Sequence, residues 1–246
     1  MNDRAPRGGG DLILLALGVA LAGWFIGNGF AIVRSTDRYA TVKGVAEREV
    51  KADLALWPIG LAATDNDLSL AQSRINQNVA KVMAFLAASG VDTTDAELQG
   101  LRVTDRLANP YGPVERVGSR FIIRQTVMVR SNDPERIRAT SEKVGELVNA
   151  GIVLQSGEEY GPGGPTYLFK RLNDVKPSMI AEATAEARKA AEQFAKDSKS
   201  RLGGIRRASQ GVFSILPRDE APGINEQSQI YKTVRVVTTV EYLLKN

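Results

Sequence analysis

The sequence predicts an α+β protein with a transmembrane helix near its N-terminus, and three observations support this fold class. Residues 12–33 contain no charged side chain, and an apolar segment of this length forms a helix that spans a bilayer. From residue 39 onward, segments with alternating apolar residues occur in pairs, and segments with helical periodicity separate them. Their order is ββαββ, a linking helix and ββαββ again, which predicts antiparallel β-sheet with packed helices.

The ends of the apolar segment divide the chain into four parts. Residues 1–11 form a short N-terminal tail, residues 12–33 a transmembrane signal anchor, residues 34–38 a polar linker, and residues 39–246 the folded domain. A domain of about 210 residues buries a substantial core without disulfides or metals. We therefore expect one α+β domain beyond the membrane helix.

The apolar segment has an alternative interpretation as a cleaved signal peptide. Ala20-Leu21-Ala22 has the small-x-small form of a cleavage site, and cleavage there would remove residues 1–22. An uncleaved anchor is favoured because residues 23–33 stay apolar beyond this site. Basic residues flank the segment on both sides, so the positive-inside rule gives no orientation. A short tail before a long domain is typical of a signal anchor, which predicts a single-pass protein of the bacterial inner membrane with its C-terminal domain in the periplasm.

A stripe of small residues runs along the apolar segment. Gly23 and Gly27 form a G-x-x-x-G motif, and Ala31 continues it. Such a stripe lets membrane helices approach closely, although glycine and alanine are also common in membrane helices without this role. The three residues are candidates for membrane-helix packing.

The folded domain opens with two predicted strands at residues 39–45 and 54–63. Pro58 predicts that the second strand lies at a sheet edge or contains a bulge. A helix is expected over residues 67–89, with an aspartate as N-cap and Gly90 as C-terminal stop. Its apolar face, at helical spacing, consists of Ile75, Val79, Val82, Met83 and Leu86.

The second strand pair is expected at residues 101–104 and 121–130. Asp133-Pro134-Glu135 then opens another helix, with proline at its first position, and Gly151 ends it. In the second strand, alternate residues share one face, and in the helix a group of apolar residues faces inward. These residues are Phe121, Ile123, Val127 and Val129 for the strand, and Ile137, Val144, Leu147 and Val148 for the helix.

The longest helix of the domain is predicted over residues 174–202, with Gly203-Gly204 as its stop. Alanines dominate its inner face and permit close packing against a sheet or a neighbouring helix. This face consists of Ile180, Ala183, Ala187, Ala191, Phe194 and Leu202. The remaining strands are expected at residues 152–154, 167–169, 205–216 and 233–244.

Two residue types are absent, and their absence excludes several kinds of chemistry. The sequence contains no cysteine, which excludes disulfides and thiol chemistry. It also contains no histidine, which excludes Ser-His-Asp hydrolases and histidine-ligated zinc sites. The net charge of +4 is spread over a large domain and does not favour nucleic-acid binding. Chemistry based on carboxylates, lysine or oxygen ligands stays open.

The acidic clusters are better explained by local structure than by chemistry. Asp65-Asn66-Asp67 lacks the glycine and the distal glutamate of a calcium loop, so helix capping is favoured. Asp92, Asp95 and Glu97 are expected in a solvated turn. Glu158 and Glu159 would supply acid–base carboxylates, but no partner is visible in the sequence. We therefore assign no catalytic, cofactor-binding or metal-binding residue and expect no cofactor.

A run of basic residues follows the alanine-rich segment. Three of its members fall in the last turns of the predicted helix, where cations complement the helix dipole. The alternative is a surface that interacts with anionic lipid or an acidic partner. The run consists of Lys196, Lys199, Arg201, Arg206 and Arg207.

Several short motifs occur in the order and spacing of a known family. They are Val42-x-Gly44, Ala52-Asp53, Gly90-Val91, Gln99, Ala183-x-x-x-Ala187-x-Lys189-Ala190, Phe194-Ala195 and Leu202-Gly203. On these residues the chain resembles the SIMPL-domain family of YggE-like bacterial periplasmic proteins, over nearly all of residues 39–244. Residues 172–203 resemble a membrane-anchored subgroup in particular. Ala52 departs from the proline that the family often has.

The resemblance implies an α+β fold, periplasmic exposure and large ring- or channel-like homo-oligomers. Family names refer to oxidative-stress defence, but no catalytic mechanism or catalytic residue comes with them. The leading hypothesis is therefore a non-enzymatic, membrane-tethered protein of the cell envelope. It would form homo-oligomers and would contact the lipid bilayer through residues 12–33. The alternatives are a carboxylate-based envelope enzyme and an adaptor that binds another envelope membrane protein.

Overall fold

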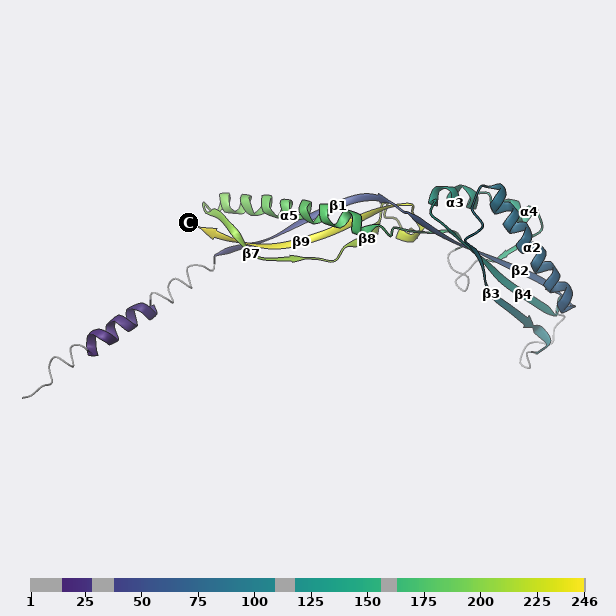
Figure 1. The fold of residues 1–246 in the computed structure, drawn as a ribbon, viewed down its shortest axis with the longest axis horizontal. Coiled ribbons are helices and arrows are strands. Elements are labelled where there is room, and N and C mark those ends of the chain that lie inside the picture. Colours follow the sequence, from purple (N-terminus) through teal and green to yellow (C-terminus); the bar gives the residue numbers. More distant parts are fainter. Residues whose placement is uncertain (1–14, 28–37, 109–117, 156–162, 246) are drawn as a thin grey trace, which may run out of the picture. The chain divides into compact units, whose positions relative to one another are not determined.

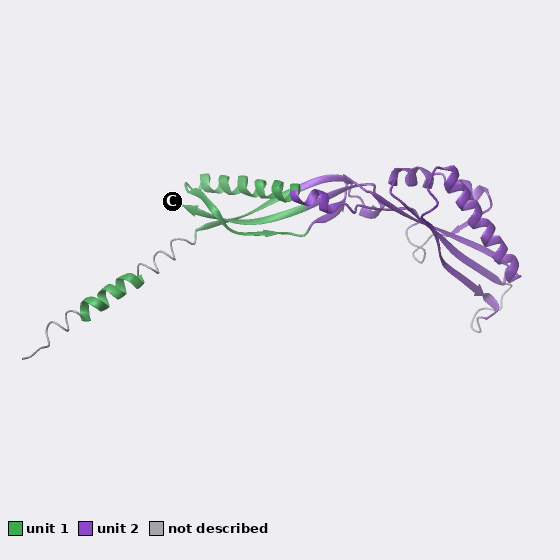
Figure 2. Ribbon diagram, in the orientation of Figure 1, with its two compact units in different colours: residues 1–46, 178–212, 236–246 green, residues 47–177, 213–235 purple. Residues whose placement is uncertain are grey.

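The structure, a computed structural model, describes residues 15–27, 38–108, 118–155 and 163–245 (Figure 1). The chain folds into two compact units, which Figure 2 shows in green and purple. The terminal unit consists of residues 1–46, 178–212 and 236–246, and the central unit consists of residues 47–177 and 213–235.

From the first strand onward, the chain forms pairs of strands and intervening helices. Their order is β1 (Tyr39–Lys51), β2 (Leu54–Asp65), α2 (Leu68–Ala88), β3 (Ala96–Asp105), η1 (Arg106–Ala108), β4 (Phe121–Ser131), α3 (Pro134–Ser141), α4 (Gly145–Asn149), β5 (Val153–Gln155), β6 (Thr166–Leu168), α5 (Leu172–Asp197), β7 (Arg201–Gln210), β8 (Ser214–Pro217), η3 (Glu226–Ser228) and β9 (Tyr231–Lys245).

The predicted α+β class is confirmed by two antiparallel sheets with packed helices. One sheet has the order β1-β9-β7, with β8 paired to β9, and the other has the order β3-β4-β2-β5, with β6 paired to β2. The first predicted ββαββ segment is observed as β1, β2, α2, β3 and β4. The second differs, because residues 211–213 separate β7 from β8 and three strands follow α5. The sheets combine β1 with the last strands, so the repeated order is not a structural duplication.

The N-terminal apolar segment is described only in part, as a helix over residues 15–27. Within the described residues, no helix has both the length and the apolar character needed to cross a membrane. The transmembrane prediction is therefore not confirmed. Around Gly23 and Gly27 no other atom lies within 4 Å of an added Cβ atom, while Ala31 and most of the predicted linker lie outside the described residues.

β2 is an inner strand of its sheet, so the prediction that Pro58 marks an edge or a bulge is wrong. β2 pairs with β4 over its length, and Pro58 lies opposite Met128 with no register shift. On the other side of β2, residues 54–56 pair with β6 and residues 60–62 pair with β5. Pro58 therefore lies in the gap between two short strands, where a proline interrupts no continuous ladder on that side.

α2 covers one face of this sheet and completes the core of the central unit (Figure 1). The helix begins after Asp67 and ends at Ala88, and Gly90 follows its C-cap Ser89 as the predicted stop. The Gly90 amide donates to the Ala87 carbonyl (2.9 Å), and its φ of +72° is the left-handed conformation that closes a helix. The predicted apolar face is confirmed, with Ile75, Val82 and Leu86 fully buried against Ile123, Val127 and Val129 of β4.

The helix predicted between Asp133 and Gly151 divides into α3 and α4. Asp133 accepts a hydrogen bond from the Arg136 amide (3.1 Å), which confirms the predicted cap. The break after Ser141 shifts the helical phase, and as a result Val148 is 55% exposed instead of facing inward. Ile137 and Leu147 are buried as predicted.

α5 packs on the sheet of the terminal unit through a stripe with four-residue spacing. The buried residues of the stripe are Met179, Ala183, Ala187, Ala191 and Ala195. Ile180 is only half-buried, and Phe194 is 59% exposed, so both predictions for the inner face are wrong. Leu202 lies in β7 and packs against the same core from the sheet.

α5 ends earlier than predicted, and Gly203-Gly204 is not its stop. Lys199 adopts a left-handed φ of 52°. The Ser200 amide donates to the Ala195 carbonyl (2.9 Å) and the Lys199 amide to the Lys196 carbonyl (3.1 Å), which is the pair of bonds of a Schellman motif. The two glycines therefore lie inside β7.

The closest contact between α5 and the sheet lies at Gly44 of β1. A Cβ atom at this position would overlap the Ala183 carbonyl oxygen and lie 2.5 Å from the Ala187 amide nitrogen. Both neighbours are backbone atoms, which rotation of a side chain cannot move. Glycine is therefore required where the strand backbone lies against the helix backbone.

Gly44→Ala is expected to lower the free energy of unfolding of the terminal unit by about 3 kcal/mol or more, because overpacking against backbone forces the helix away from the sheet. Urea unfolding of the full chain in detergent, followed by circular dichroism, measures this change. Gly204→Ala in β7 is the matched control, since no atom lies within 4 Å of its added Cβ. Equal stability of the two variants would contradict the close contact.

Candidate functional site

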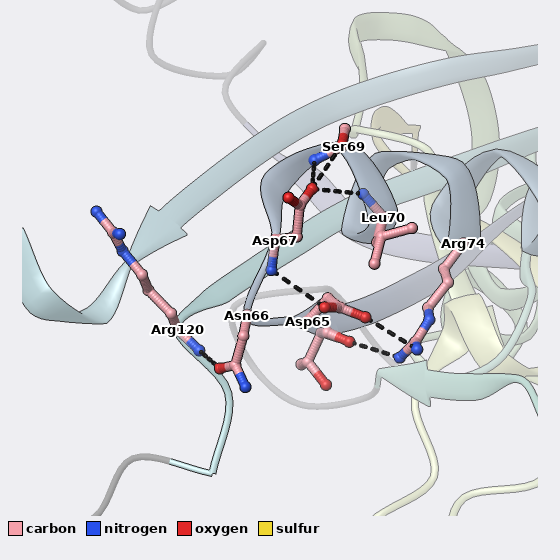
Figure 3. Close-up of polar contacts among 8 residues, drawn as sticks. Asp65, Asn66, Asp67, Ser69, Leu70, Arg74 and Arg120 are labelled. Atoms are coloured by element: carbon pink, nitrogen blue, oxygen red, sulfur yellow. Dashed lines mark hydrogen bonds and ion pairs between the residues drawn. The ribbon is translucent and has the colours of Figure 1, made fainter.

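The turn before α2 holds the acidic cluster that the sequence placed at a helix cap (Figure 3). Asp67 Oδ1 accepts hydrogen bonds from the amides of Ser69 (2.7 Å) and Leu70 (3.1 Å) and from the Ser69 hydroxyl. The Asp67 amide donates to Asp65 Oδ1 (3.1 Å). The three bonds that the Asp67 carboxylate accepts, led by the one from the Ser69 hydroxyl, lower the pKa of Asp67. The capping interpretation is confirmed.

Basic residues hold the rest of this turn. Asp65 forms an ion pair with Arg74 of α2 (2.9 Å), and the Arg120 amide donates to the Asn66 side chain (3.0 Å) (Figure 3). Within the described ranges, no group of three or more acidic side chains is arranged to hold a metal ion. The carboxylates of the turn are thus used by backbone amides and by arginine.

The second acidic cluster is also a turn. Asp92 Oδ1 accepts hydrogen bonds from the Thr94 amide (2.9 Å) and the Thr94 hydroxyl, which lower the pKa of Asp92. Glu97 lies on β3 and accepts a hydrogen bond from Gln99 (2.9 Å). Glu158 and Glu159 lie outside the described residues.

The predicted basic surface lies in the terminal unit, and all of its residues are exposed. They are Lys196, Lys199, Arg201, Arg206 and Arg207. Because α5 ends at Asp197, only Lys196 lies in its last turn, and the last three residues lie on β7. Arg206 lies 4.3 Å from the centre of the Tyr39 ring and 3.9 Å from Glu241. Whether this surface interacts with a lipid or a protein stays a prediction.

A polar cleft in the central unit was not predicted from the sequence. Its volume is about 550 Å³. It lies among α3, β6, the first residues of β9 and the segment between β8 and β9. The side chains that line it are Glu135, Arg138, Tyr167, Arg218, Asp219, Ile224, Ser228, Gln229, Ile230 and Tyr231.

Glu135 connects three elements at one side of the polar cleft. Its carboxylate forms an ion pair with Lys51 at the end of β1 (2.8 Å) and accepts a hydrogen bond from the Tyr231 hydroxyl (3.3 Å). The hydrogen bond from Lys51 is the main cause that lowers the pKa of Glu135 and raises the pKa of Lys51. Glu135 is therefore held in its charged form, which is unsuited to a general acid.

Another part of the polar cleft is lined by a segment with many internal hydrogen bonds. The Gln229 side chain accepts hydrogen bonds from the amides of Arg218 (2.9 Å) and Asp219 (3.2 Å) and donates to the Asp219 carbonyl (2.7 Å). The Arg218 guanidinium pairs with Asp219 (2.8 Å) and lies 5.2 Å from the centre of the Tyr231 ring. Gln229 thus holds the backbone of residues 218 and 219 in a position that places Arg218 over the Tyr231 ring.

A buried lysine attaches this segment to β9. The Lys232 side chain is fully buried, and its Nζ lies 2.5 Å from both the backbone carbonyl oxygen and the Oε1 atom of Glu226. Glu226 lies in η3, where Asn225 caps the short helix through the Ser228 amide (2.9 Å). A buried ammonium group is tolerated only when it is paired in this way.

Sequence spacing carries no sign of the polar cleft. Lys51, Glu135 and Tyr231 are far apart in the chain, and none belongs to a recognisable motif. The backbone brings them together, since the Ala52 amide donates to the Ile230 carbonyl (2.8 Å). The cleft presents both signs of charge and paired carboxylates, which suits the binding of a polar group better than proton transfer.

Asp67→Ala is expected to lower the urea midpoint of unfolding at pH 7, whereas Asp67→Asn is the matched control because an amide oxygen also caps a helix. The folded-state pKa of Asp67 lies below its ordinary 3.8. The charge of Asp67 therefore stabilises the folded state above this ordinary pKa, and the stabilisation is lost as the pH falls through the folded-state pKa. Wild type and Asp67→Asn should converge on acidification, and a gap that widens would contradict the capping role.

Lys232→Met is expected to lower the free energy of unfolding of the central unit by about 3 to 5 kcal/mol, since it removes one partner of a buried ion pair. Hydrogen exchange of the amides in residues 218–230 should accelerate as well. Lys245→Met, at the exposed end of the same strand, is the control. The role of the pair is refuted if both variants unfold at the same urea concentration.

The comparisons with known proteins agree with the resemblance of the motifs. The sequence model of the SIMPL family, described as a protein of unknown function (DUF541), matches residues 40–242. A search of curated proteins finds no match. The family match begins in β1 and ends in β9, so it includes both compact units, while the membrane-anchored subgroup stays a prediction. The chain belongs to the SIMPL family.

Proposed function

We propose that the chain is a non-enzymatic, membrane-tethered protein of the bacterial cell envelope that assembles with further copies of itself. The observation that carries this proposal is the edge strand β3. Its only strand partner within the described residues is β4. An unpaired edge with exposed apolar side chains is a template for pairing with another chain.

The exposed side chains of β3 are large and apolar. Leu98 and Leu101 are each 54% exposed, and Val103 is 50% exposed. Leu98 and Val103 lie opposite Val127 and Ile123 of β4, and thus on the face that carries α2. α2 packs over β2 and β4, so these two residues of β3 lie at the margin of the helix.

The charges of β3 favour a second copy as the occupant of this edge. The strand carries both signs, with Glu97, Arg102 and Asp105. Two copies that meet along β3 therefore bring opposite charges together and bury their leucines, without an excess of either sign. A partner with a strongly acidic or basic edge would lack this balance.

Membrane tethering is supported by the uncharged residues 12–33, which directly precede the linker and the family match. Family membership supports export, with the folded units in the periplasm and the anchor in the inner membrane. The stripe at Gly23, Gly27 and Ala31 would add helix contacts to the assembly. Ring- or channel-like geometry is the form of homo-oligomer that the family resemblance suggests.

The alternative of a carboxylate-based enzyme receives less support. The polar cleft contains Glu135 and Asp219, but each carboxylate is bound to a basic side chain, Lys51 or Arg218. A catalytic pair needs one carboxyl group that releases or accepts a proton near the working pH. The paired charges of both signs in the polar cleft are better suited to binding a polar group.

The assembly is tested by light scattering after size exclusion of the full chain in detergent. Wild type is expected to form a homo-oligomer, and the double variant Leu98→Lys, Leu101→Lys is expected to dissociate, because two charges on the edge oppose pairing. Val212→Lys is the matched control, since this residue is 87% exposed and lies outside β3.

A monodisperse wild-type monomer would refute self-assembly. A monomer that is recovered from native membranes with a stoichiometric second protein would instead support the adaptor alternative. If the double variant and Val212→Lys both remain oligomeric, copies assemble through another surface and the role of β3 is wrong.

A further inference from the structure

Two arginines lie opposite each other on the open face of the central sheet. Arg102 of β3 is the direct cross-strand partner of Arg124 of β4. The residue before Arg124 in β4, Ile123, is fully buried in the core that α2 covers. Neighbouring strand residues point to opposite faces, so Arg124 and Arg102 lie on the face away from α2. Like charges directly opposite each other destabilise a sheet.

A β-bulge creates this arrangement. Gln99 pairs with Thr126, whereas Arg102 pairs with Arg124, so β3 has one extra residue between the two pairs. Gly100 lies in the bulge with a left-handed φ of +65°. If the ladder continued from Gln99 without a bulge, Arg102 would lie opposite Ile123 and face the α2 side of the sheet. Bulges that re-aim a side chain are frequent next to functional sites.

One donor of the Arg124 guanidinium, its Nε atom, lacks a hydrogen-bond partner in the described part of the chain. This nitrogen atom is also buried. A buried donor on a charged group costs free energy when it stays unpaired. An acceptor that comes from a ligand would satisfy this donor.

Both arginines line one cavity of about 270 Å³. Gln99 and Thr126 lie beside them and add neutral polar groups, while Pro58 and Met128 form an apolar wall. This volume is slightly below that of typical small-molecule pockets, which suits one anionic group with a few attached atoms. Guanidinium groups bind carboxylate and phosphate through paired hydrogen bonds.

We propose that this cavity binds an oxyanion, either a carboxylate or a phosphate group, between Arg102 and Arg124. The site shares Arg102 with the edge strand of the proposed self-assembly, but it lies on the face away from α2, whereas Leu98 and Val103 lie on the α2 side of β3. The bulge at Gly100 sets the distance between the two cations, and Gln99 and Thr126 orient the ligand.

Calorimetric titration of the full chain in detergent, at constant ionic strength, tests the site with inorganic phosphate and with succinate as probes. At least one probe is expected to bind saturably, and Arg124→Gln should weaken that binding about tenfold or more, as expected for a charged hydrogen bond. Arg130→Gln is the matched control, because Arg130 lies on the same strand and face and carries the same charge. Its binding should equal that of wild type.

Thermal unfolding distinguishes a ligand-binding role from a structural one. In buffer without phosphate or carboxylate, Arg124→Gln should be at least as stable as wild type, since it removes one of two like charges that lie directly opposite each other. Added probe should stabilise wild type but not the variant. Absence of saturable binding for both probes, or an equal loss in Arg124→Gln and Arg130→Gln, would overturn the proposal. Binding of one probe alone supports it and identifies the anion.

Discussion

The terminal unit depends on the contact between Gly44 of β1 and the backbone of α5. Because Gly44 has no side chain, the backbone of α5 lies directly against the strand, with the Ala183 carbonyl and the Ala187 amide next to Gly44. The alanines at four-residue spacing along α5 make this approach possible over the whole helix. The core beneath is small, formed by Val42, Ala187, Ala191, Val240 and Tyr242. A core of this size is stable only when the backbones pack closely.

This contact gives the family motifs a physical meaning. Val42-x-Gly44 and Ala183-x-x-x-Ala187 are far apart in sequence, yet in the fold they are the two sides of one interface. In the central unit, the motif Ala52-Asp53 also joins segments that are far apart in sequence. Asp53 accepts hydrogen bonds from the amides of Lys170 (2.9 Å) and Arg171 (3.0 Å), which directly precede α5. The motifs therefore specify how α5 is held, which explains why they indicate a fold and no reaction.

The features that were predicted correctly are local. The Asp67 cap and the Gly90 stop depend on residues within one helical turn, and the alternation in β4 depends on one strand. The wrong predictions concern features that depend on contacts between residues far apart in sequence or on backbone geometry. Pro58 lies in an inner strand because two short strands share one side of β2, and α5 ends at a left-handed Lys199 although two glycines follow. The polar cleft and the Arg102–Arg124 pair depend on strand pairing and on a bulge, neither of which composition or periodicity reveals.

The most direct test of the central contact is a nuclear Overhauser measurement on the labelled full chain in detergent micelles. The site of the missing Gly44 Cβ lies 2.5 Å from the Ala187 nitrogen. A strong cross-peak is therefore expected between one Gly44 Hα proton and the Ala187 amide proton. If this cross-peak is absent while the neighbouring β1–β9 cross-peaks are present, the helix does not lie on the strand backbone and the account of the fold is wrong.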